Sequence, residues 1–241
     1  MNTLENKVAI VTGASSGIGF GIARELARAG AQTILAARSV APLEALKAEI
    51  EQDGGIAHVV QTDVSREEDI MALFAKTQEL AGPLDILVNN AGIADATPLE
   101  DLSLDRWNMM LATNLTSAVL CAREAMRAMK GRGGRIINIG SLSAKIPRPH
   151  SPAYTMTKFA LEGLTKSISL DGRDDYISAT TIHPGATRSM LAPGHTDTMG
   201  EDCLEPEMLG QLVVYICGLP RQVTMLDTVM LPVKVPFLGR G

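Results

Sequence analysis

The stretch Thr12-Gly13-Ala14-Ser15-Ser16-Gly17-Ile18-Gly19 decides the fold of this chain. It lies between an apolar run at 8–11 and an amphipathic helical pattern that places Ile18, Ile22 and Leu26 on one face. Glycines at such a junction permit a tight turn and let backbone N–H groups approach a phosphate, which the positive end of the helix also attracts. Three glycines can also form a plain connection. The strand-to-helix position favours a dinucleotide-binding loop with contacts from Gly13, Ser15, Ser16, Gly17, Ile18 and Gly19.

Short apolar runs alternate with longer helical patterns along the rest of the chain. One of the intervening helices is expected to begin with Ser65 as its N-cap, with Glu68 three residues later, and to repeat its apolar spacing as far as Leu80. Strand, helix and strand in repetition require crossover connections, so we predict an α/β fold, a doubly wound Rossmann-type parallel sheet with helices on both faces. The apolar runs predict strands at 8–11, 33–36, 57–61, 86–88, 136–139 and 179–182.

Length, composition and charge narrow the classes of protein. The 241 residues, 46% of them apolar and 20% charged, contain no linker-like tract and no internal repeat, so we expect a single dinucleotide-binding domain over 1–241. A net charge of -5 repels phosphodiester backbones and argues against a nucleic-acid partner. We interpret the one basic cluster as a solvated helix end, formed by Arg123, Arg127, Lys130, Arg132 and Arg135.

Cysteine usage and the apolar segments bear on location. The three cysteines are far apart in the sequence and lack metal-ligand spacing, which is typical of a reduced cytosolic protein, and no His/Asp/Glu cluster indicates a metal. The N-terminus carries Glu5 and Lys7 without a small-residue cleavage site. The longest apolar stretch, around 209–219, is too short to span a bilayer. We expect a cytoplasmic protein with no membrane partner and no metal.

The cofactor type depends on the end of the run at 33–36. Dinucleotide-binding folds that prefer NAD place a carboxylate there to bond the ribose 2′-hydroxyl, whereas this chain has Ala36-Ala37-Arg38. No carboxylate would repel a 2′-phosphate, and the planar guanidinium of Arg38 can pair with one. We therefore expect NADP in preference to NAD. The alternative is that Arg38 is a solvated surface residue.

Tyr154 and Lys158 form a candidate proton-transfer pair. They lie four residues apart in a helical pattern and share a face. A free tyrosine has a pKa of about 10, too high for efficient acid/base work at neutral pH, and an adjacent ammonium favours the phenolate. Ser141, at the end of the run at 136–139, can donate a hydrogen bond to a substrate oxygen on which charge develops. By itself each feature also fits an ordinary surface contact or turn.

With these motifs in place, the chain resembles the short-chain dehydrogenase/reductase family from Lys7 to about Leu219. The match includes the TGxxxGxG loop, the Asn89-Asn90-Ala91-Gly92 motif and Pro184-Gly185. The resemblance implies an Asn-Ser-Tyr-Lys catalytic tetrad, which here is Asn114, Ser141, Tyr154 and Lys158. It also implies cofactor contacts from Asp63, Val64, Asn90, Ala91, Gly92, Tyr154, Lys158, Pro184, Gly185, Thr187 and Ser189.

The resemblance also implies roles for single residues. In the family the tetrad asparagine kinks its helix and holds a water that links the lysine to solvent, and the lysine binds the nicotinamide ribose. Ser189 stands where the family usually has a threonine that touches the carboxamide. The tail from Val223 to Gly241 lacks the usual Asp-Gly-Gly ending, so the resemblance leaves a homodimer or a homotetramer open.

A loop without periodicity follows the Pro184-Gly185 turn. A segment of this length, about 186–205, is unusual in a compact domain unless it acts as a substrate lid. Its apolar side chains are expected either to line a pocket or only to pack the loop, and they are Met190, Leu191, Met199 and Leu204. Two histidines near the site are interpreted as polar surface residues, His150 and His195.

These features predict an NADP-dependent oxidoreductase that moves a hydride between the nicotinamide and the carbon of a carbonyl or secondary alcohol. Tyr154 would donate or accept the proton, and the partner would be a small molecule. The alternative is a catalytically silent dinucleotide-binding sensor or interaction protein. The complete tetrad argues against a sensor, which needs only the phosphate loop. Epimerases and dehydratases of the family are longer than this chain.

Overall fold

The structure is a computed structural model that describes residues 3–189, 202–235 and 237. In these residues, seven strands form a parallel sheet in the order β3-β2-β1-β4-β5-β6-β7. The direction of winding reverses between β1 and β4, and doubly wound sheets bind ligands at the carboxyl ends of the strands at this point. The strands are β1 (Val8–Thr12), β2 (Gln32–Ala37), β3 (Ile56–Gln61), β4 (Ile86–Asn89), β5 (Gly134–Ile139), β6 (Ile177–Pro184) and β7 (Asp227–Met230).

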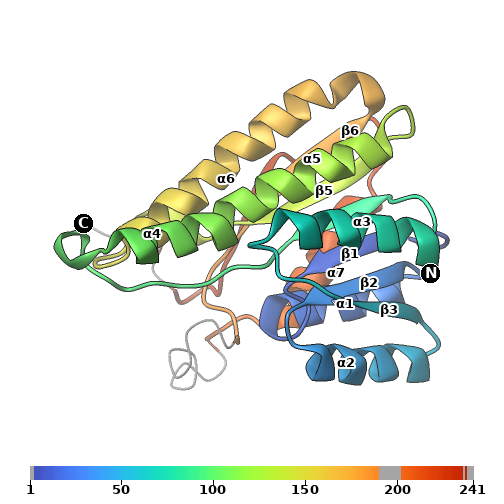
Figure 1. Ribbon diagram of the computed structural model, residues 1–241, viewed down its shortest axis with the longest axis horizontal. Helices are drawn as coiled ribbons and strands as arrows, with labels where there is room; N and C mark the ends of the chain where they lie inside the picture. Colours follow the sequence, from blue (N-terminus) through green and yellow to red (C-terminus); the bar gives the residue numbers. More distant parts are fainter. Residues whose placement is uncertain (1–2, 190–201, 236, 238–241) are drawn as a thin grey trace.

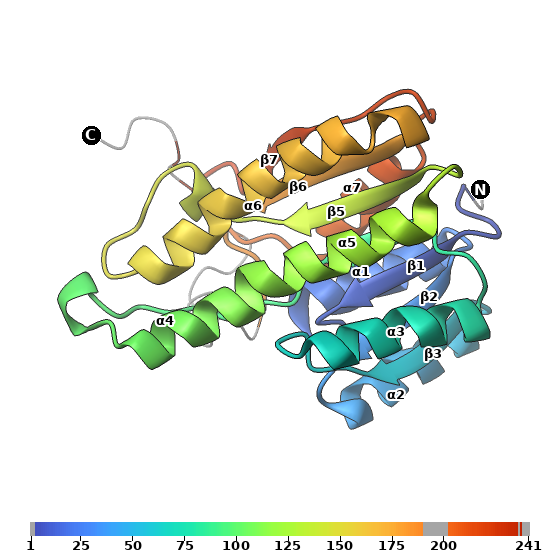
Figure 2. The same cartoon turned by 45° about the horizontal axis from the view of Figure 1, so that its top comes forward.

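Helices cover both faces of the sheet (Figures 1 and 2). Apolar side chains of α1, α2 and α7 form the core on one face, and those of α3, α5 and α6 form the core on the other. The predicted doubly wound fold is therefore confirmed. The helices are α1 (Gly17–Arg28), α2 (Val40–Gln52), α3 (Glu67–Leu80), α4 (Leu104–Leu111), α5 (Ser117–Met129), α6 (Pro152–Asp171) and α7 (Pro206–Cys217).

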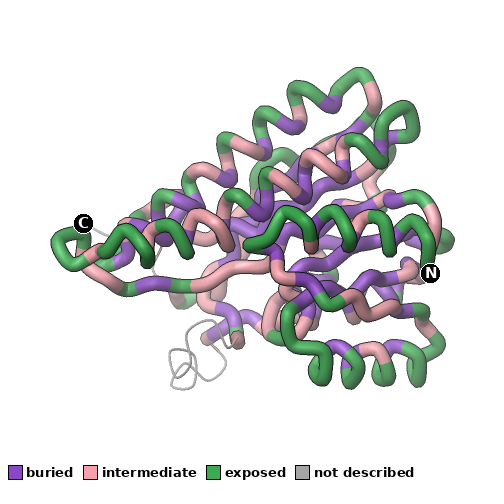
Figure 3. The backbone as a smooth tube through the Cα atoms, in the orientation of Figure 1, coloured by how far each residue is buried: buried purple, intermediate pink, exposed green. Residues whose placement is uncertain are grey.

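The central strands are apolar along their whole length because both of their faces are covered. In β1, Ala9 and Val11 belong to the core under α1, whereas Val8 and Ile10 point to the core under α3 and α5. Figure 3 shows the result as buried strands between helices whose outer faces are exposed. Each fully buried large aliphatic side chain contributes about 2 kcal/mol of apolar transfer free energy.

Three sequence-based predictions about elements are wrong. The set of six predicted strands misses β7, which pairs only with β6 at the edge of the sheet and is partly exposed, so it lacks a strong apolar pattern. Ser65 does not cap α3, which begins at Glu67 after Arg66. The Ser65 hydroxyl instead donates to the Asp63 carboxylate at 2.7 Å, a local turn that competes with capping. Leu80, expected on the apolar face, is exposed.

Arg135 is buried, which corrects its assignment to a solvated helix end. It lies on β5, and its guanidinium donates to the carbonyls of Leu219 (2.7 Å), Pro220 (2.9 Å) and Val223 (2.6 Å). A fourth bond reaches Ser178 Oγ at 2.7 Å. The arginine thus satisfies the backbone carbonyls of the segment that connects α7 to β7, and it fixes that connection to the centre of the sheet.

We expect Arg135→Met to lower the free energy of unfolding by about 3 kcal/mol, because three partly buried carbonyls lose their charged donor. The matched control is Arg127→Met from the same basic cluster, whose side chain is 65% exposed. The control is expected to change the free energy of unfolding by less than about 0.5 kcal/mol. Urea denaturation of both variants measures the difference, and equal losses would contradict the structural role of Arg135.

Candidate active site

A cavity of about 1460 Å³ lies at the carboxyl ends of the central strands. It brings together almost all of the predicted site residues from loops that are far apart in the sequence. Two predicted residues, Gly19 and Asn114, lie behind its wall. The predicted residues that line it are Gly13, Ser15, Ser16, Gly17, Ile18, Arg38, Asp63, Val64, Asn90, Ala91, Gly92, Ser141, Tyr154, Lys158, Pro184, Gly185, Thr187 and Ser189.

The glycine loop between β1 and α1 is shaped by backbone-to-backbone packing. Gly13 and Gly17 have φ angles of +67° and +55°, a region that residues with a side chain rarely adopt. A Cβ on Gly19 would lie 2.3 Å from the Gly13 carbonyl oxygen, so only glycine fits. Ser16, the N-cap of α1, makes no side-chain capping bond. The loop therefore presents free backbone at a helix N-terminus, which fits the pyrophosphate of a dinucleotide.

A set of hydrogen bonds holds this loop against the turn after β4. Thr12 Oγ1 accepts the N–H groups of Asn90 (3.0 Å) and Ala91 (3.1 Å). The Asn90 side-chain amide donates to the carbonyls of Thr12 (2.9 Å) and Gly13 (3.2 Å). In this structure, Asn90 thus supports the loop as well as lining the cavity. The sequence places Thr12 at the start of the glycine loop but does not predict that its hydroxyl bonds the turn after β4.

Arg38 and Asp63 line the end of the cavity near β2 and β3. Arg38 is exposed at the end of β2, and within the described part of the chain its guanidinium pairs with no carboxylate. Across the cavity, hydrogen bonds from Ser65 and then the charge of Arg38 hold the pKa of Asp63 below its usual range. Ser39 also lines this end and was missed, although a serine just before a helical pattern indicates an N-cap near an anion site.

Asn114 lies in a π-helical turn, Ala112–Thr116, between α4 and α5. The two ends of its side-chain amide bind the backbone of Ile93. Oδ1 accepts the Ile93 N–H at 2.8 Å, and Nδ2 donates to the Ile93 carbonyl at 2.9 Å. A longer bond of 3.4 Å reaches Thr157 Oγ1 on α6. The distorted turn matches the expected poor fit of asparagine inside a helix. Its side chain fixes the loop after β4 to the helices.

The Ser141, Tyr154 and Lys158 side chains meet where β5 ends. Tyr154 and Lys158 are buried on the first turns of α6, and the Lys158 ammonium donates to the Ile139 carbonyl at 2.8 Å. Burial raises the pKa of Tyr154, while a hydrogen bond with Ser141 and the charge of Arg148 lower it. Burial also lowers the pKa of Lys158 to about 8.

Burial has a larger effect on the tyrosine than the sequence suggested. The Lys158 ammonium is 5.6 Å from the centroid of the Tyr154 ring, yet the pKa of Tyr154 is raised from its ordinary value because the phenol is buried. Desolvation of the phenol dominates. Arg148, which lines the cavity near Tyr154, was missed by sequence reasoning because nothing in its neighbourhood forms a motif.

The cavity is also lined by apolar and polar residues that the sequence did not predict. Near Tyr154, Met110 and Ala153 form a small core with it, and Ile93 and Trp107 are partly buried against this core. Most of the additional lining residues carry no sequence motif. The apolar ones include Ile93, Ala94, Met109, Leu142 and Ile146, and the polar ones include Asn108, Thr113, Ser143 and Arg148.

The predicted lid is described only at its two ends. Thr187 pairs with Leu204, and the Arg188 N–H and Leu204 N–H donate to the Leu204 and Ala186 carbonyls at 2.9 and 2.8 Å. Leu204 is buried and packs on the α1 side of the core rather than lining the cavity. His150 is exposed. The remaining predicted lid residues lie outside the described residues, namely Met190, Leu191, His195 and Met199.

Comparison with known proteins decides the family. A family model described as short chain dehydrogenase matches residues 7–199. The chain belongs to the short-chain dehydrogenase/reductase family. Farnesol dehydrogenase of Aedes aegypti is 36% identical over 247 residues, which cover 98% of this chain and 100% of the relative. Dehydrogenase/reductase SDR family member 11 of Homo sapiens is 33% identical over 252 residues, which cover 97% of each chain.

Solved structures of the family share the fold of this chain. An alcohol dehydrogenase from the archaeon Thermococcus sibiricus, complexed with 5-hydroxy-NADP, has a TM-score of 0.88 and 30% identity, and the match covers 94% of this chain and 97% of the other. A short chain dehydrogenase from Burkholderia cenocepacia J2315 in complex with NADP has a TM-score of 0.86 and 31% identity, with 95% and 97% covered. This short-chain dehydrogenase/reductase is an oxidoreductase of a family that uses nicotinamide dinucleotides. Among its described residues, no helix is long and apolar enough to cross a membrane.

We expect Gly19→Ala to weaken dinucleotide binding, because the new Cβ would push the Gly13 backbone away and disturb the loop N–H groups that bind the phosphates. Each hydrogen bond from a loop N–H group to a phosphate that is lost should weaken binding at least about tenfold. The control is Gly163→Ala in α6, where an added Cβ meets nothing within 4 Å. The control is expected to keep full affinity and to gain up to about 1 kcal/mol of stability from helix propensity. Fluorescence titration with NADPH measures both, and unchanged affinity in Gly19→Ala would refute the loop assignment.

Proposed function

We propose that this protein is an NADP-dependent reductase of carbonyl compounds or dehydrogenase of secondary alcohols. The observation that carries the proposal is the single cavity in which Arg38 and the glycine loop lie at one end and Ser141, Tyr154 and Lys158 at the other. The residues fit the cofactor, since the loop offers free backbone to a pyrophosphate and Arg38 offers a cation to a 2′-phosphate. The NADP complexes of two similar enzymes support the same assignment.

When bound, the cofactor supplies or accepts the hydride. Ser141 hydrogen-bonds the substrate oxygen and stabilises the negative charge that grows on it. The Tyr154 hydroxyl gives its proton to that oxygen in reduction and takes it back in oxidation. Lys158 has three N–H donors, of which Ile139 takes one, and the others serve the nicotinamide ribose. Asn114 holds the loop after β4 and a water that connects the lysine to solvent.

The substrate is a small molecule with an apolar body. The cavity wall contains apolar side chains such as Met109, Leu142 and Ile146, and one relative is a farnesol dehydrogenase, a name that denotes an enzyme for an apolar alcohol. The chain acts as one dinucleotide-binding domain, with Thr187 and Ser189 on the nicotinamide side. A homodimer or homotetramer and a cytoplasmic location complete the proposal.

The competing function is a dinucleotide-binding sensor without turnover. The buried Tyr154 and Lys158 favour the enzyme, because placing a phenol and an ammonium out of water costs free energy that a sensor has no reason to bear. Nicotinamide absorbance, followed over a panel of ketones and alcohols, separates the two functions. Tight NADPH binding with no turnover of any compound would favour the sensor.

We expect Tyr154→Phe to lower kcat by about 100-fold or more, since the transition state loses its proton donor. The Kd for NADPH should stay within about twofold because the phenol contributes little to cofactor binding. The matched control is Tyr176→Phe, an exposed tyrosine far from the cavity, which should keep full activity. Steady-state kinetics with isothermal titration measures both quantities, and substantial turnover in Tyr154→Phe would contradict the assignment.

We expect Arg38→Ala to lose affinity for NADPH by about tenfold to 100-fold and to keep its affinity for NADH, because only NADPH has the 2′-phosphate. Arg66→Ala is the control, since this exposed arginine follows β3 nearby but pairs with Glu68 and does not line the cavity. Paired titrations with the two reduced cofactors test the expectation. An unchanged preference would show that Arg38 does not pair with the phosphate.

A further inference from the structure

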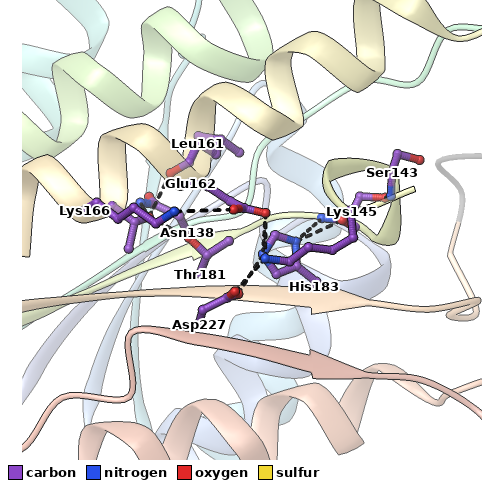
Figure 4. Close-up of polar contacts among 11 residues, drawn as sticks. Asn138, Ser143, Lys145, Leu161, Glu162, Lys166, Thr181, His183 and Asp227 are labelled. Carbon is purple, nitrogen blue, oxygen red and sulfur yellow. Dashed lines mark hydrogen bonds and ion pairs between the residues drawn. The ribbon is translucent and has the colours of Figure 1, made fainter. Parts of the chain in front are cut away.

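Four ionisable side chains from four elements meet behind the candidate active site (Figure 4). Lys145 follows the short turn η3 (Leu142–Ala144), Glu162 lies on α6, His183 on β6 and Asp227 on β7. The Lys145 ammonium is 2.8 Å from Glu162 Oε1 and 2.5 Å from Asp227 Oδ2. His183 Nε2 is 2.9 Å from Asp227 Oδ1 and 3.4 Å from Glu162 Oε1. We call these four residues the ion cluster.

The ion cluster has the donor set of a metal site but already contains a cation. The carboxylates and the imidazole place their ligand atoms within 4.8 Å of one another, an assembly that the sequence did not indicate. Lys145 lies among them and contacts both carboxylates. Because its ammonium supplies the positive charge that a metal ion would bring, the cluster is an ion network of the chain itself.

His183 connects the ion cluster to Ser141. Its side chain is fully buried, and Nδ1 lies 2.9 Å from the Ser141 carbonyl oxygen and 3.4 Å from the Ser141 nitrogen. The ring comes this close only because residue 140 is glycine, where a Cβ would lie 2.7 Å from Nδ1. The imidazole therefore sits between the Asp227 carboxylate and the peptide groups of a residue that faces the substrate.

The proton on His183 Nδ1 decides which atom of Ser141 the ring holds. Without this proton Nδ1 accepts the Ser141 N–H, whereas a ring protonated at Nδ1, as the imidazolium or as the neutral Nδ1–H tautomer, donates to the Ser141 carbonyl. Burial lowers the pKa of His183, and so does Lys145, while the Ser141 carbonyl, Asp227 and Glu162 raise it. The only other charge next to the cluster in the described residues is Lys166, 3.8 Å from Glu162 Oε2.

The same cluster is joined to the proton-transfer pair through α6. Tyr154, Lys158 and Glu162 follow one another at four-residue spacing and share one face of the helix. Lys145 ties Glu162 to the end of the turn that begins at Ser141. The cluster thus connects the helix that carries the tyrosine and lysine to both ends of the turn that carries the serine.

We propose that His183 is a positioning residue, which holds Ser141 at the distance from Tyr154 that carbonyl polarisation requires. Asp227 orients the ring, and Lys145 and Glu162 anchor the far end of the serine turn. The inference rests on the proposed carbonyl/alcohol chemistry for its kinetic consequence, although the contact between His183 and Ser141 is independent of it.

A double-mutant cycle between His183 and Ser141 tests the proposal. We expect His183→Gln to lower kcat by about tenfold to 100-fold, the effect of a small misplacement of a catalytic group, with an unchanged Kd for NADPH. In the Ser141→Ala background the same substitution should lower kcat by no more than about twofold, because the group that it positions is gone. An equal factor in both backgrounds would show a general structural effect and overturn the proposal.

Two further variants complete the cycle. Asp227→Asn, on the edge strand, replaces His183→Gln if the latter unfolds, and it should show the same dependence on Ser141. Lys166→Met is the control, since this side chain is 63% exposed and touches only the outer oxygen of Glu162. The control should keep wild-type kcat.

An NMR measurement separates this inference from the proposed function. In ¹⁵N-labelled wild-type protein, the Ser141 amide resonance should titrate together with the His183 ring, and it should differ in His183→Gln but not in Lys166→Met. Absence of turnover in the wild type would refute the proposed function and leave this result standing. A Ser141 resonance that stays constant while the ring titrates, or that His183→Gln leaves unchanged, would overturn the positioning role.

Discussion

The hydrogen bond from the buried Lys158 ammonium to the Ile139 carbonyl is the contact on which the candidate site depends. An ammonium removed from water needs oxygen acceptors, because an uncompensated buried charge costs several kcal/mol. The last carbonyl of β5 provides one, so α6 must run with Lys158 at the end of that strand. Tyr154, one turn earlier, and Ser141, two residues beyond the strand, are then brought together as a consequence.

A second constraint acts on the other side of the cavity, where the backbone segments of the glycine loop pack directly against each other without side chains between them. The Gly13 carbonyl and the backbone of Gly19 are too close for any Cβ, and the Asn90 side chain occupies the remaining space beside them. Side chains that could shield the helix N-terminus are thereby excluded, and the backbone N–H groups stay open to an anion. The candidate phosphate loop and the candidate proton-transfer pair are thus built by opposite means. The loop lacks side chains, whereas the pair consists of two buried polar side chains.

Local patterns explain why much of this could be predicted. Strands covered on both faces appear as apolar runs, the glycine loop is contiguous, and Tyr154 and Lys158 are one helical turn apart, so each leaves a short signature in the sequence. Contacts that join distant segments leave none. The bonds of Arg135 to three carbonyls of the segment before β7, and the pairing of β7 itself, connect residues more than forty positions apart or at a sheet edge, where no periodicity marks them. The raised pKa of Tyr154 depends on burial, which spacing alone does not reveal.

The C-terminal segment shows how an unusual sequence can still serve the site. Its ending departs from the family pattern, yet β7 pairs in parallel with β6 and sets Asp227 beside His183, on the strand that leads directly to Pro184-Gly185. The nearby Gly185 N–H donates to the Met230 carbonyl at 2.7 Å, so β7 also holds the start of the nicotinamide-side turn. One edge strand therefore fixes both the Pro184-Gly185 turn at the cavity and, through the imidazole, the peptide of Ser141. The edge strand β7 is only partly buried, so apolar packing does little to fix its position. The charged contacts of Asp227 with Lys145 and His183 fix the position of β7 beside β6 instead.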